Sequence, residues 1–402
     1  MGGNHIKENF YCRRKTSVII LIIVFFFGLF PKTGYTQSSG KSIFQEELSK
    51  EIEAYIKSTG GDIAIEYYDL TSSETYTRNN LRGYMAASTI KLPLVMYVIE
   101  LVDQKKLDIN ETLTYNKRHY VGGSGVIKNE KVGTSYTIED LIQKSIVYSD
   151  NIAFEMLKEK VGQNNYVNYM KRLGASFSTP NALKNTSAND LVLYARQLYQ
   201  YSEYSDNARK LVETLQQTVY NETIPSGIPN KKVSHKVGMI PMYNISHDFG
   251  IVYDEEPYVL SIMTKGFAYE KSKSVIATIA SIVDKHHQQK VKYIELTSDS
   301  PIYKLQSDHQ SIGILKVNEI FRVTSNEDTM YGIQFGSSII YVPKSHVKET
   351  TIKPTNYFIH KRPTFATLYA IDEVDVLKKP SPDEDIIATL SENIKITSIR
   401  KI

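Results

Sequence analysis

A serine and a lysine stand one helical turn apart at the start of a long apolar segment. Ser88 and Lys91 lie in "YMAASTIKLPLVMYVIELV", residues 84–102. Residues i and i+3 share one face of a helix, so the lysine can reach the serine hydroxyl. A lysine that is partly desolvated beside an apolar helix has a lowered pKa and can act as a base. The pair could therefore form an activated nucleophile, although a capping serine beside a solvated lysine gives the same pattern.

Two further polar motifs follow in order. Ser149-Asp150-Asn151, in "VYSDNIAFEML", begins another expected helix, where an ordinary N-cap is the alternative. Lys236-Val237-Gly238, in "VSHKVGMIP", lies on an expected strand, where a lysine that faces solvent is the alternative. Three such motifs in this order, each on its expected element, indicate a single active site.

Together the motifs resemble the signature of the class A β-lactamase and penicillin-binding protein superfamily, which is Ser-x-x-Lys, Ser-Asp-Asn and Lys-Thr-Gly. The resemblance covers about residues 43–290. It implies that Ser88 is the acylated nucleophile, that Lys91 is its base partner and that Ser149 relays a proton to the leaving nitrogen. The substrate implied is a β-lactam or a peptidoglycan-like amide or ester.

The resemblance also implies how the substrate is held. Asn151 would bind the substrate's amide side chain, and Lys236 would supply positive charge near its carboxylate. The backbone N–H groups of Ser88 and Met239 would form the oxyanion hole, and Val237 and Gly238 would lie beside the substrate. No cofactor and no metal is implied. The adjacent His286 and His287 lack a third ligand at a suitable spacing, so we expect them to be solvated at a helix end.

Two departures from the family pattern bear on activity. Val237 stands where the family has a threonine, so a hydroxyl that helps to bind a carboxylate is missing. Residues 161–189 contain no Asp or Glu, whereas class A β-lactamases carry a glutamate on a loop there. The sequence therefore predicts acylation with slow hydrolysis. A wall-associated penicillin-binding or sensor protein, or a D,D-peptidase, remains the alternative.

The elements around the motifs predict a two-lobed enzyme. Apolar residues at four-residue steps indicate a helix over 43–58, and alternation in "GDIAIEYYDL" indicates a strand. Residues 89–220 are mostly helical, strands return from 232, and a last helix covers 271–288. This order favours an α/β (α+β) β-lactamase/transpeptidase-like fold, with an antiparallel sheet and a helical lobe, over residues 43–295.

The C-terminal region has a different texture, with short β-like segments and turns. "SIGILKVNEIFRVT" (311–324) is similar to "DIIATLSENIKITS" (385–398), at an offset of about 74 residues. We expect small all-β domains that resemble bacterial SH3-like modules, at 296–350 and, as an incomplete second repeat, at 365–402. Modules of this kind commonly bind peptidoglycan, and a domain with only a packing role is the alternative. The second repeat is either degenerate or cut short.

The N-terminus has the layout of a secretory signal peptide over residues 1–37. Basic residues precede the apolar run Val18–Phe30, and polar, small residues follow it. The run is short for a membrane span, so an uncleaved anchor is the less favoured alternative. The chain has 48 Lys and Arg residues and 44 Asp and Glu residues. Residues 1–37 hold five of the basic residues and one of the acidic residues, so 43 basic and 43 acidic residues remain after residue 37. This balance excludes nucleic acid as an expected partner. We expect a secreted, cell-wall-associated protein without a stable membrane span.

Overall fold

The computed structural model describes residues 12–14, 42–177, 184–335, 338–353, 363–369, 374–377, 386–391 and 395–401. The chain divides into two compact units. The larger unit spans Glu47–Gln288, and the smaller unit combines the residues before Glu47 with those after Gln288. All three motifs lie in the larger unit.

A five-stranded antiparallel sheet, in the order β3-β2-β10-β9-β8, forms the centre of the larger unit. The strands are β2 (Asp62–Asp69), β3 (Thr75–Arg78), β8 (Lys232–Ile240), β9 (Ile245–Tyr253) and β10 (Tyr258–Lys265). β10 pairs with β2 on one side and with β9 on the other, which joins the N-terminal strands to the C-terminal ones. Ile63, Ile65 and Tyr67 are fully buried, as the alternation in the sequence predicts for a central strand.

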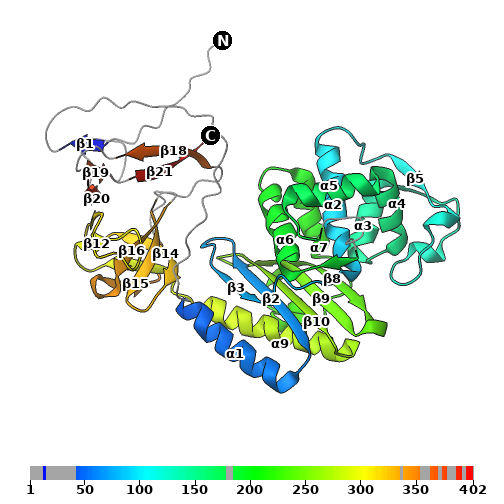
Figure 1. The fold of residues 1–402 in the computed structure, drawn as a ribbon. Coiled ribbons are helices and arrows are strands. Elements are labelled where there is room, and N and C mark those ends of the chain that lie inside the picture. The colour runs from blue at the N-terminus through cyan, green and yellow to red at the C-terminus, as the bar shows by residue number, and fades with distance from the viewer. Residues whose placement is uncertain are drawn as a thin grey trace, which may run out of the picture. The chain divides into compact units, whose positions relative to one another are not determined.

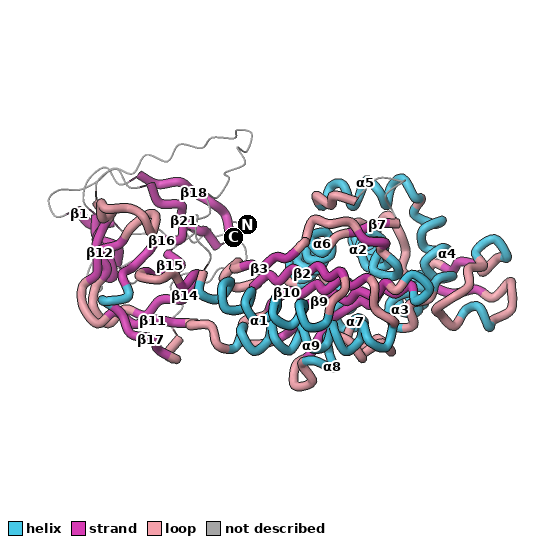
Figure 2. The backbone as a smooth tube through the Cα atoms, turned by 60° about the horizontal axis from the view of Figure 1, so that its bottom comes forward, coloured by secondary structure: helices cyan, strands magenta, loops and turns pink. Residues whose placement is uncertain are grey.

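Two long helices cover one face of this sheet. Figures 1 and 2 show α1 (Ile43–Thr59) and α9 (Tyr269–Gln288) along the same side of the strands. Their buried residues repeat at helical spacing, as in Leu48, Ile52 and Ile56 of α1. An apolar stripe of this kind stabilises a helix only when a partner surface covers it, and the sheet supplies that surface.

A helical lobe lies on the other face (Figure 1). Its helices are α2 (Lys91–Asp103), α3 (Ile138–Val147), α4 (Asn151–Val161), α5 (Gln163–Leu173), α6 (Ala188–Ser202), α7 (Asp206–Leu215) and the short α8 (Ile224–Gly227). α6 packs on β2, β9 and β10, and α2 lies among α3 to α7. One hydrophobic core joins these helices to the sheet and surrounds α2. The expected helical block between two sets of strands is therefore confirmed.

The smaller unit consists of antiparallel strands. One sheet has the order β16-β15-β14-β11-β17, another has the order β1-β19-β20-β13-β12, and β18 pairs with β21. The strands are β1 (Cys12–Arg14), β11 (Tyr293–Leu296), β12 (Ser300–Ile302), β13 (Gly313–Leu315), β14 (Ile320–Asn326), β15 (Met330–Phe335), β16 (Ser338–Pro343), β17 (Val347–Thr350), β18 (Pro363–Tyr369), β19 (Val374–Leu377), β20 (Ile386–Leu390) and β21 (Lys395–Lys401). The larger unit ends at Gln288, whereas the sequence predicts an enzyme domain that extends to residue 295. β11 lies beyond Gln288 and pairs with β14 and β17 of the smaller unit.

The strands of the smaller unit repeat as the sequence does. β13 and β14 of the first copy correspond to β20 and β21 of the second at the offset of about 74 residues. β12 pairs with β13 as β19 pairs with β20, and β11 pairs with β14 as β18 pairs with β21. β13 also pairs with β20, so the two copies share a sheet. The resemblance of each copy to an SH3-like module stays a prediction.

Most of the expected leader lies outside the described residues. Its described part, Cys12–Arg14, forms β1 and pairs with β19. A chain from which the leader has been removed would lack this pairing. No helix in the described ranges combines the length and the apolar character that a membrane crossing requires.

Candidate active site

Ser88 lies in a single turn of 3₁₀ helix, η1 (Ala87–Ile90), directly before α2. Ala87 has a φ of 50°, in the left-handed region that side chains rarely adopt. A residue held there typically costs about 1–3 kcal/mol, so the surroundings must enforce the turn. The Thr89 hydroxyl donates to Ala86 O at 2.6 Å, and Tyr166 donates to Ile90 O at 2.7 Å. These bonds fix the turn that presents the half-buried Ser88.

Lys91 is the first residue of α2 and is almost fully buried, at 2% exposure. Its Nζ lies 3.0 Å from Ser88 Oγ, 3.2 Å from Ser149 Oγ and 2.7 Å from Asn151 Oδ1. It also donates to the backbone carbonyl of Ser149. Burial, followed by the positive charge of Lys236, lowers the pKa of Lys91 well below its usual value. A neutral amine beside a serine hydroxyl is what a serine nucleophile requires as its base.

Asp150 fastens the second motif to the site. It is the N-cap of α4, and its Oδ1 accepts from the backbone N–H groups of Ile152 and Ala153 at 2.9 Å. Its Oδ2 accepts from Val126 N at 2.6 Å and Ile127 N at 2.8 Å. The N-cap reading of this motif is therefore right for Asp150. Its neighbours in the motif have a different role, since both contact Lys91.

Ser149 lies between the two lysines of the site. Its φ is 51°, which makes it, like Ala87, a non-glycine residue in the left-handed region. Lys236 Nζ donates to Ser149 Oγ at 3.0 Å, and Lys91 Nζ lies 3.2 Å from the same atom. Ser149 therefore connects the lysine beside the nucleophile to the lysine of β8.

Lys236 is fully buried, which excludes the alternative of a strand lysine that faces solvent. Besides Ser149 Oγ, its Nζ contacts Val237 O at 2.9 Å. Burial lowers the pKa of Lys236 to about 7, and the charge of Asp248 opposes this fall. The ammonium group is therefore close to losing its proton at neutral pH.

Gly238 allows β8 to approach the nucleophile. A Cβ placed on Gly238 would lie 2.9 Å from Thr89 N and 3.0 Å from Ala86 O, which are backbone atoms of the Ser88 turn. Val237 is buried at 3% exposure, and Met239 follows Gly238 on the same strand. The strand thus passes directly beside the turn at Gly238.

The loop before α3 forms a rim beside Asn151. Asn151 Nδ2 donates to Gly122 O at 2.7 Å, and Lys128 Nζ donates to Gly123 O at 2.6 Å. A Cβ at Gly125 would lie 2.4 Å from the Asp150 carboxylate, so only glycine fits there. Gly122 is exposed, and a Cβ at that position would meet nothing within 4 Å.

A sequence profile of the Beta-lactamase enzyme family matches residues 47–287, more than half of the chain. The chain belongs to the beta-lactamase enzyme family. The matched range contains all eight candidate site residues and agrees with the larger unit, Glu47–Gln288. The smaller unit lies wholly outside the matched range.

Relatives and solved structures agree with this membership. Extended-spectrum beta-lactamase PER-1 of Pseudomonas aeruginosa is 24% identical over 296 residues, which are 65% of this chain and 93% of the relative. Beta-lactamase SME-1 of Serratia marcescens is 24% identical over 54% of this chain and 81% of its own. The structure of PBP-A matches with a TM-score of 0.56 at 20% identity, over 61% of this chain and 97% of that one. A beta-lactamase from Sphaerobacter thermophilus gives the same TM-score at 20% identity, over 61% and 98%. The solved structures show that the fold is shared.

Asp190 is the acidic residue that follows the loop where class A β-lactamases carry a glutamate, and its carboxylate has structural partners. Asp190, the first acidic residue after the acid-free stretch, is fully buried on α6. Its carboxylate accepts from Ser176 N at 2.8 Å and Phe177 N at 2.9 Å. Burial raises the pKa of Asp190, and these hydrogen bonds oppose the rise. Asp190 therefore fixes the chain on the near side of residues 178–183, which lie outside the described residues.

Sequence reasoning missed His247, which is fully buried on β9 opposite Gly238. Its Nε2 contacts Met85 O at 2.9 Å, and its Nδ1 accepts from Thr264 N at 3.3 Å. Burial lowers the pKa of His247 to about 4, so the ring is neutral and donates to Met85 through Nε2. His247 thereby fixes the segment that leads to Ser88. A histidine within the apolar alternation of "ISHDFGIVY" was the available signal.

The histidine pair near the end of α9 is not solvated, contrary to our expectation. His286 is 8% exposed and His287 is fully buried. His286 Nε2 lies 2.8 Å from Glu51 Oε2, and His287 Nδ1 lies 2.8 Å from the Tyr67 hydroxyl. Both rings therefore help to pack α9 on α1 and the sheet. Across the described ranges, no group of three or more His, Cys, Asp or Glu side chains could hold a metal ion.

Proposed function

We propose that this family member is a serine hydrolase that β-lactams or peptidoglycan-like amides and esters acylate at Ser88. The observation that carries the proposal is the contact of 3.0 Å between Lys91 Nζ and Ser88 Oγ, with Lys91 buried and its pKa lowered. Burial favours the neutral form of this lysine, and the hydroxyl that a base would deprotonate lies within hydrogen-bond distance of its nitrogen.

The geometry supports a simple sequence of proton transfers. The neutral Lys91 amine takes the Ser88 hydroxyl proton as Oγ attacks the carbonyl carbon. The tetrahedral intermediate collapses with cleavage of the carbon–nitrogen bond, and the Ser149 hydroxyl gives its proton to the departing nitrogen. Lys91 or Lys236 then returns a proton to Ser149, because both amines lie within 3.2 Å of its oxygen. The ammonium of Lys236 attracts a substrate carboxylate. It does so without help from a neighbouring hydroxyl, because Val237 replaces the threonine of the family motif.

Labelling with a fluorescent penicillin tests the nucleophile. We expect the purified chain to form a stable covalent adduct, and Ser88→Ala to form none. Lys91→Ala should label at a rate lower by about 10²–10⁴-fold, because the hydroxyl then has no base. Undiminished labelling of Ser88→Ala would show that another residue is the nucleophile.

We further propose that the acyl-enzyme hydrolyses slowly. Residues 161–189 hold no carboxylate, and the Asp190 carboxylate is engaged by Ser176 and Phe177. Penicillin should therefore give a burst of about one equivalent, followed by a steady state about 10²–10⁴-fold slower than with a positioned base. Rapid multiple turnover without an accumulating acyl-enzyme would favour an ordinary β-lactamase. The second candidate is a penicillin-binding, sensor or D,D-peptidase role. The lack of a carboxylate in residues 161–189 favours it, because the acyl-enzyme would then persist.

We also propose that the protein acts outside the cytoplasm and that the smaller unit attaches it to the cell wall. The support is the leader-like pattern of residues 1–37 and the repeated β unit after Gln288. N-terminal sequencing of secreted protein should find a start after Phe30. An intact Met1 in the cytoplasmic fraction would contradict this.

A further inference from the structure

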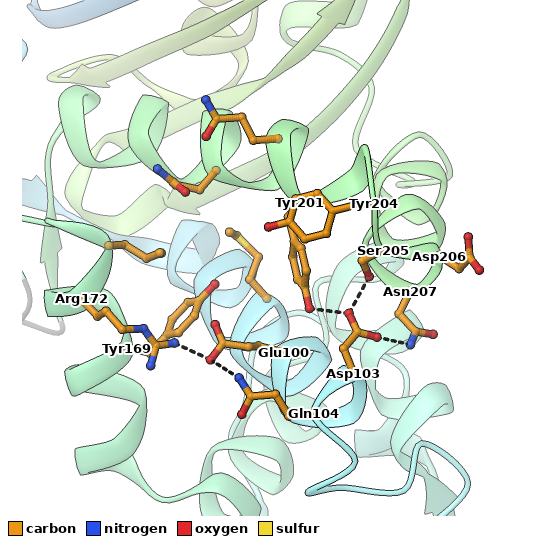
Figure 3. Close-up of a pocket in the computed structure, with 14 residues that line it drawn as sticks. Glu100, Asp103, Gln104, Tyr169, Arg172, Tyr201, Tyr204, Ser205, Asp206 and Asn207 are labelled. Carbon is orange, nitrogen blue, oxygen red and sulfur yellow. Dashed lines mark hydrogen bonds and ion pairs between the residues drawn. The ribbon is translucent and has the colours of Figure 1, made fainter. Parts of the chain in front are cut away.

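A second cleft opens in the helical lobe, away from the three motifs. Its volume is about 820 Å³, which lies within the range of about 300–1,000 Å³ found for small-molecule sites. The lining residues come from the C-terminal parts of α2, α5 and α6 and from the start of α7. Figure 3 shows Tyr169 and Arg172 on one side of the cleft, and Tyr201, Tyr204 and Ser205 on the other.

The charged groups of the cleft already have partners within the lobe. Arg172 pairs with Glu100, and Asp206 pairs with Arg209 at 2.7 Å. Asp103 accepts from Ser205 Oγ and Asn207 Nδ2 at 2.6 Å, and from the Tyr201 hydroxyl. Burial raises the pKa of Asp103, but these three hydrogen bonds outweigh it and hold the pKa below its usual value. These three donors are neutral groups, so they orient the Asp103 carboxylate without cancelling its charge, and an anionic ligand would be repelled.

The remaining lining combines aromatic rings with amides. Tyr201 and Tyr204 form a pair with ring centroids 5.4 Å apart, and Tyr204 is 60% exposed. Gln197 and Gln200 stand three residues apart on α6, so their amides share one face of the helix. The two glutamines offer both donors and acceptors. Met96 and Leu173 are the aliphatic contributions to the lining, which is too few for an apolar ligand.

A sugar ring matches this lining better than other ligand classes do. A pyranose presents an apolar C–H face, which packs on an aromatic ring, and a rim of hydroxyl groups, which hydrogen-bond to amides. A quaternary ammonium also packs on aromatic rings, but it carries no hydrogen-bonding group and would leave the amides of Gln197 and Gln200 without a partner in the ligand. We propose that this cleft binds a neutral oligosaccharide, with one ring against Tyr204 and hydroxyls on Gln197 and Gln200.

The cleft lies apart from the acylated serine. Glu100 follows Lys91 by nine residues on the same helix, which corresponds to about 14 Å along its axis. A saccharide bound there would leave Ser88 accessible. The inference therefore does not depend on the proposed function, and the two can fail separately.

Calorimetric titration of the full chain with a tetramer of N-acetylglucosamine tests the proposal. We expect saturable binding that Tyr204→Ala and Gln200→Ala each weaken about tenfold (about 1.4 kcal/mol). Tyr204→Phe should bind like the parent chain, because it keeps the ring. Tyr243→Ala removes a tyrosine of similar exposure (54%) on η5 (Pro241–Tyr243) and should change nothing.

Three outcomes overturn the proposal. The first is the absence of saturable binding. The second is binding that Tyr204→Ala leaves unchanged, which would place the sugar elsewhere, for example on the smaller unit. Competition by choline would show a cation site instead and would also overturn it. Fluorescent-penicillin labelling of Tyr204→Ala should equal that of the parent chain, and thermal melting confirms that each variant is folded.

Discussion

At the scale of single residues, two buried lysines share the chemistry of the site. In the mechanism that we propose, Lys91 is neutral when it accepts the Ser88 proton, whereas Lys236 is charged when it attracts a carboxylate. Burial lowers the pKa of both, and the charge of Lys236 lowers that of Lys91 further. The two requirements are met together only over a limited range of pH.

This arrangement predicts how labelling depends on pH. Lys236 is charged below its pKa of about 7 and loses its charge as the pH rises through that value. The second-order rate of penicillin labelling should therefore fall on the alkaline side of about pH 7. Lys236→Arg should remove the alkaline fall, because the guanidinium keeps its proton. A parent profile that stays flat well above this pH would show that the charge of Lys236 does not limit labelling.

The sequence predicted the residues that gather around Lys91 and Ser149, because their motifs resemble the family signature. Ser88 follows from helical periodicity, and Ser149, Asn151 and Lys236 follow from motif order. His247 could not be predicted in the same way, because its role depends on the register that sets it opposite Gly238. The Asp150 carboxylate likewise accepts from backbone N–H groups of a loop more than twenty residues away in the chain, and no local sequence pattern predicts this contact.

At the scale of elements, four segments meet in two close junctions. β8 touches the η1 turn at Gly238, and α4 is joined to the rim loop by Asp150. The sequence predicted the helices over 43–58 and 271–288 to within about two residues of α1 and α9, because their apolar periodicity is strong. It predicted residues 89–220 only as a mostly helical block. It did not separate the 3₁₀ turn from α2, since the positive φ of Ala87 is imposed by tertiary contacts.

Gly238→Ala tests the contact between strand and turn. The added methyl group would lie 2.8–3.0 Å from atoms of Thr89 and Ala86, so β8 must shift away from Ser88. We expect labelling to slow by about 10²-fold, because a displacement of about 1 Å has an effect of that size. Thermal melting should show a folded protein. Labelling at the parent rate would mean that the turn adapts without loss of geometry.

Asp150→Ala tests the junction between α4 and the rim. Four backbone N–H groups lose their acceptor, so we expect unfolding to be easier by about 3 kcal/mol. Asp206→Ala, at the first turn of α7 with an exposed side chain, should change the free energy by less than about 0.5 kcal/mol. Urea unfolding measures both. Equal effects in the two variants would contradict the assigned role.

At the scale of the whole molecule, the chain combines a unit that carries the family's motifs with a repeated β unit. Every candidate site residue lies within Glu47–Gln288. The sequence predicted separate enzyme and β regions from the short β-like segments after about residue 296 and from the repeat of 311–324 at 385–398. It could not predict that β13 of one copy pairs with β20 of the other, because such pairing depends on long-range register.

Deleting residues 293–402 should therefore leave the catalytic unit intact. We expect unchanged penicillin labelling, because no site residue lies in the deleted part, and loss of binding to isolated cell walls. A pull-down with wall fragments and the labelling assay measure the two properties. Loss of labelling with wall binding retained would show that the roles of the units are wrongly assigned.

The open space at Gly122 makes the rim suitable for a spectroscopic reporter. This residue is exposed, a Cβ there meets nothing within 4 Å, and its carbonyl already accepts from Asn151. Cys12 is the one cysteine in the sequence, so Gly122→Cys in a Cys12→Ser background offers a single thiol. An environment-sensitive dye attached there would lie next to the side chain expected to hold the substrate. Its emission would follow the arrival of ligand and the slow return of the free enzyme in real time, without any modification of the ligand itself.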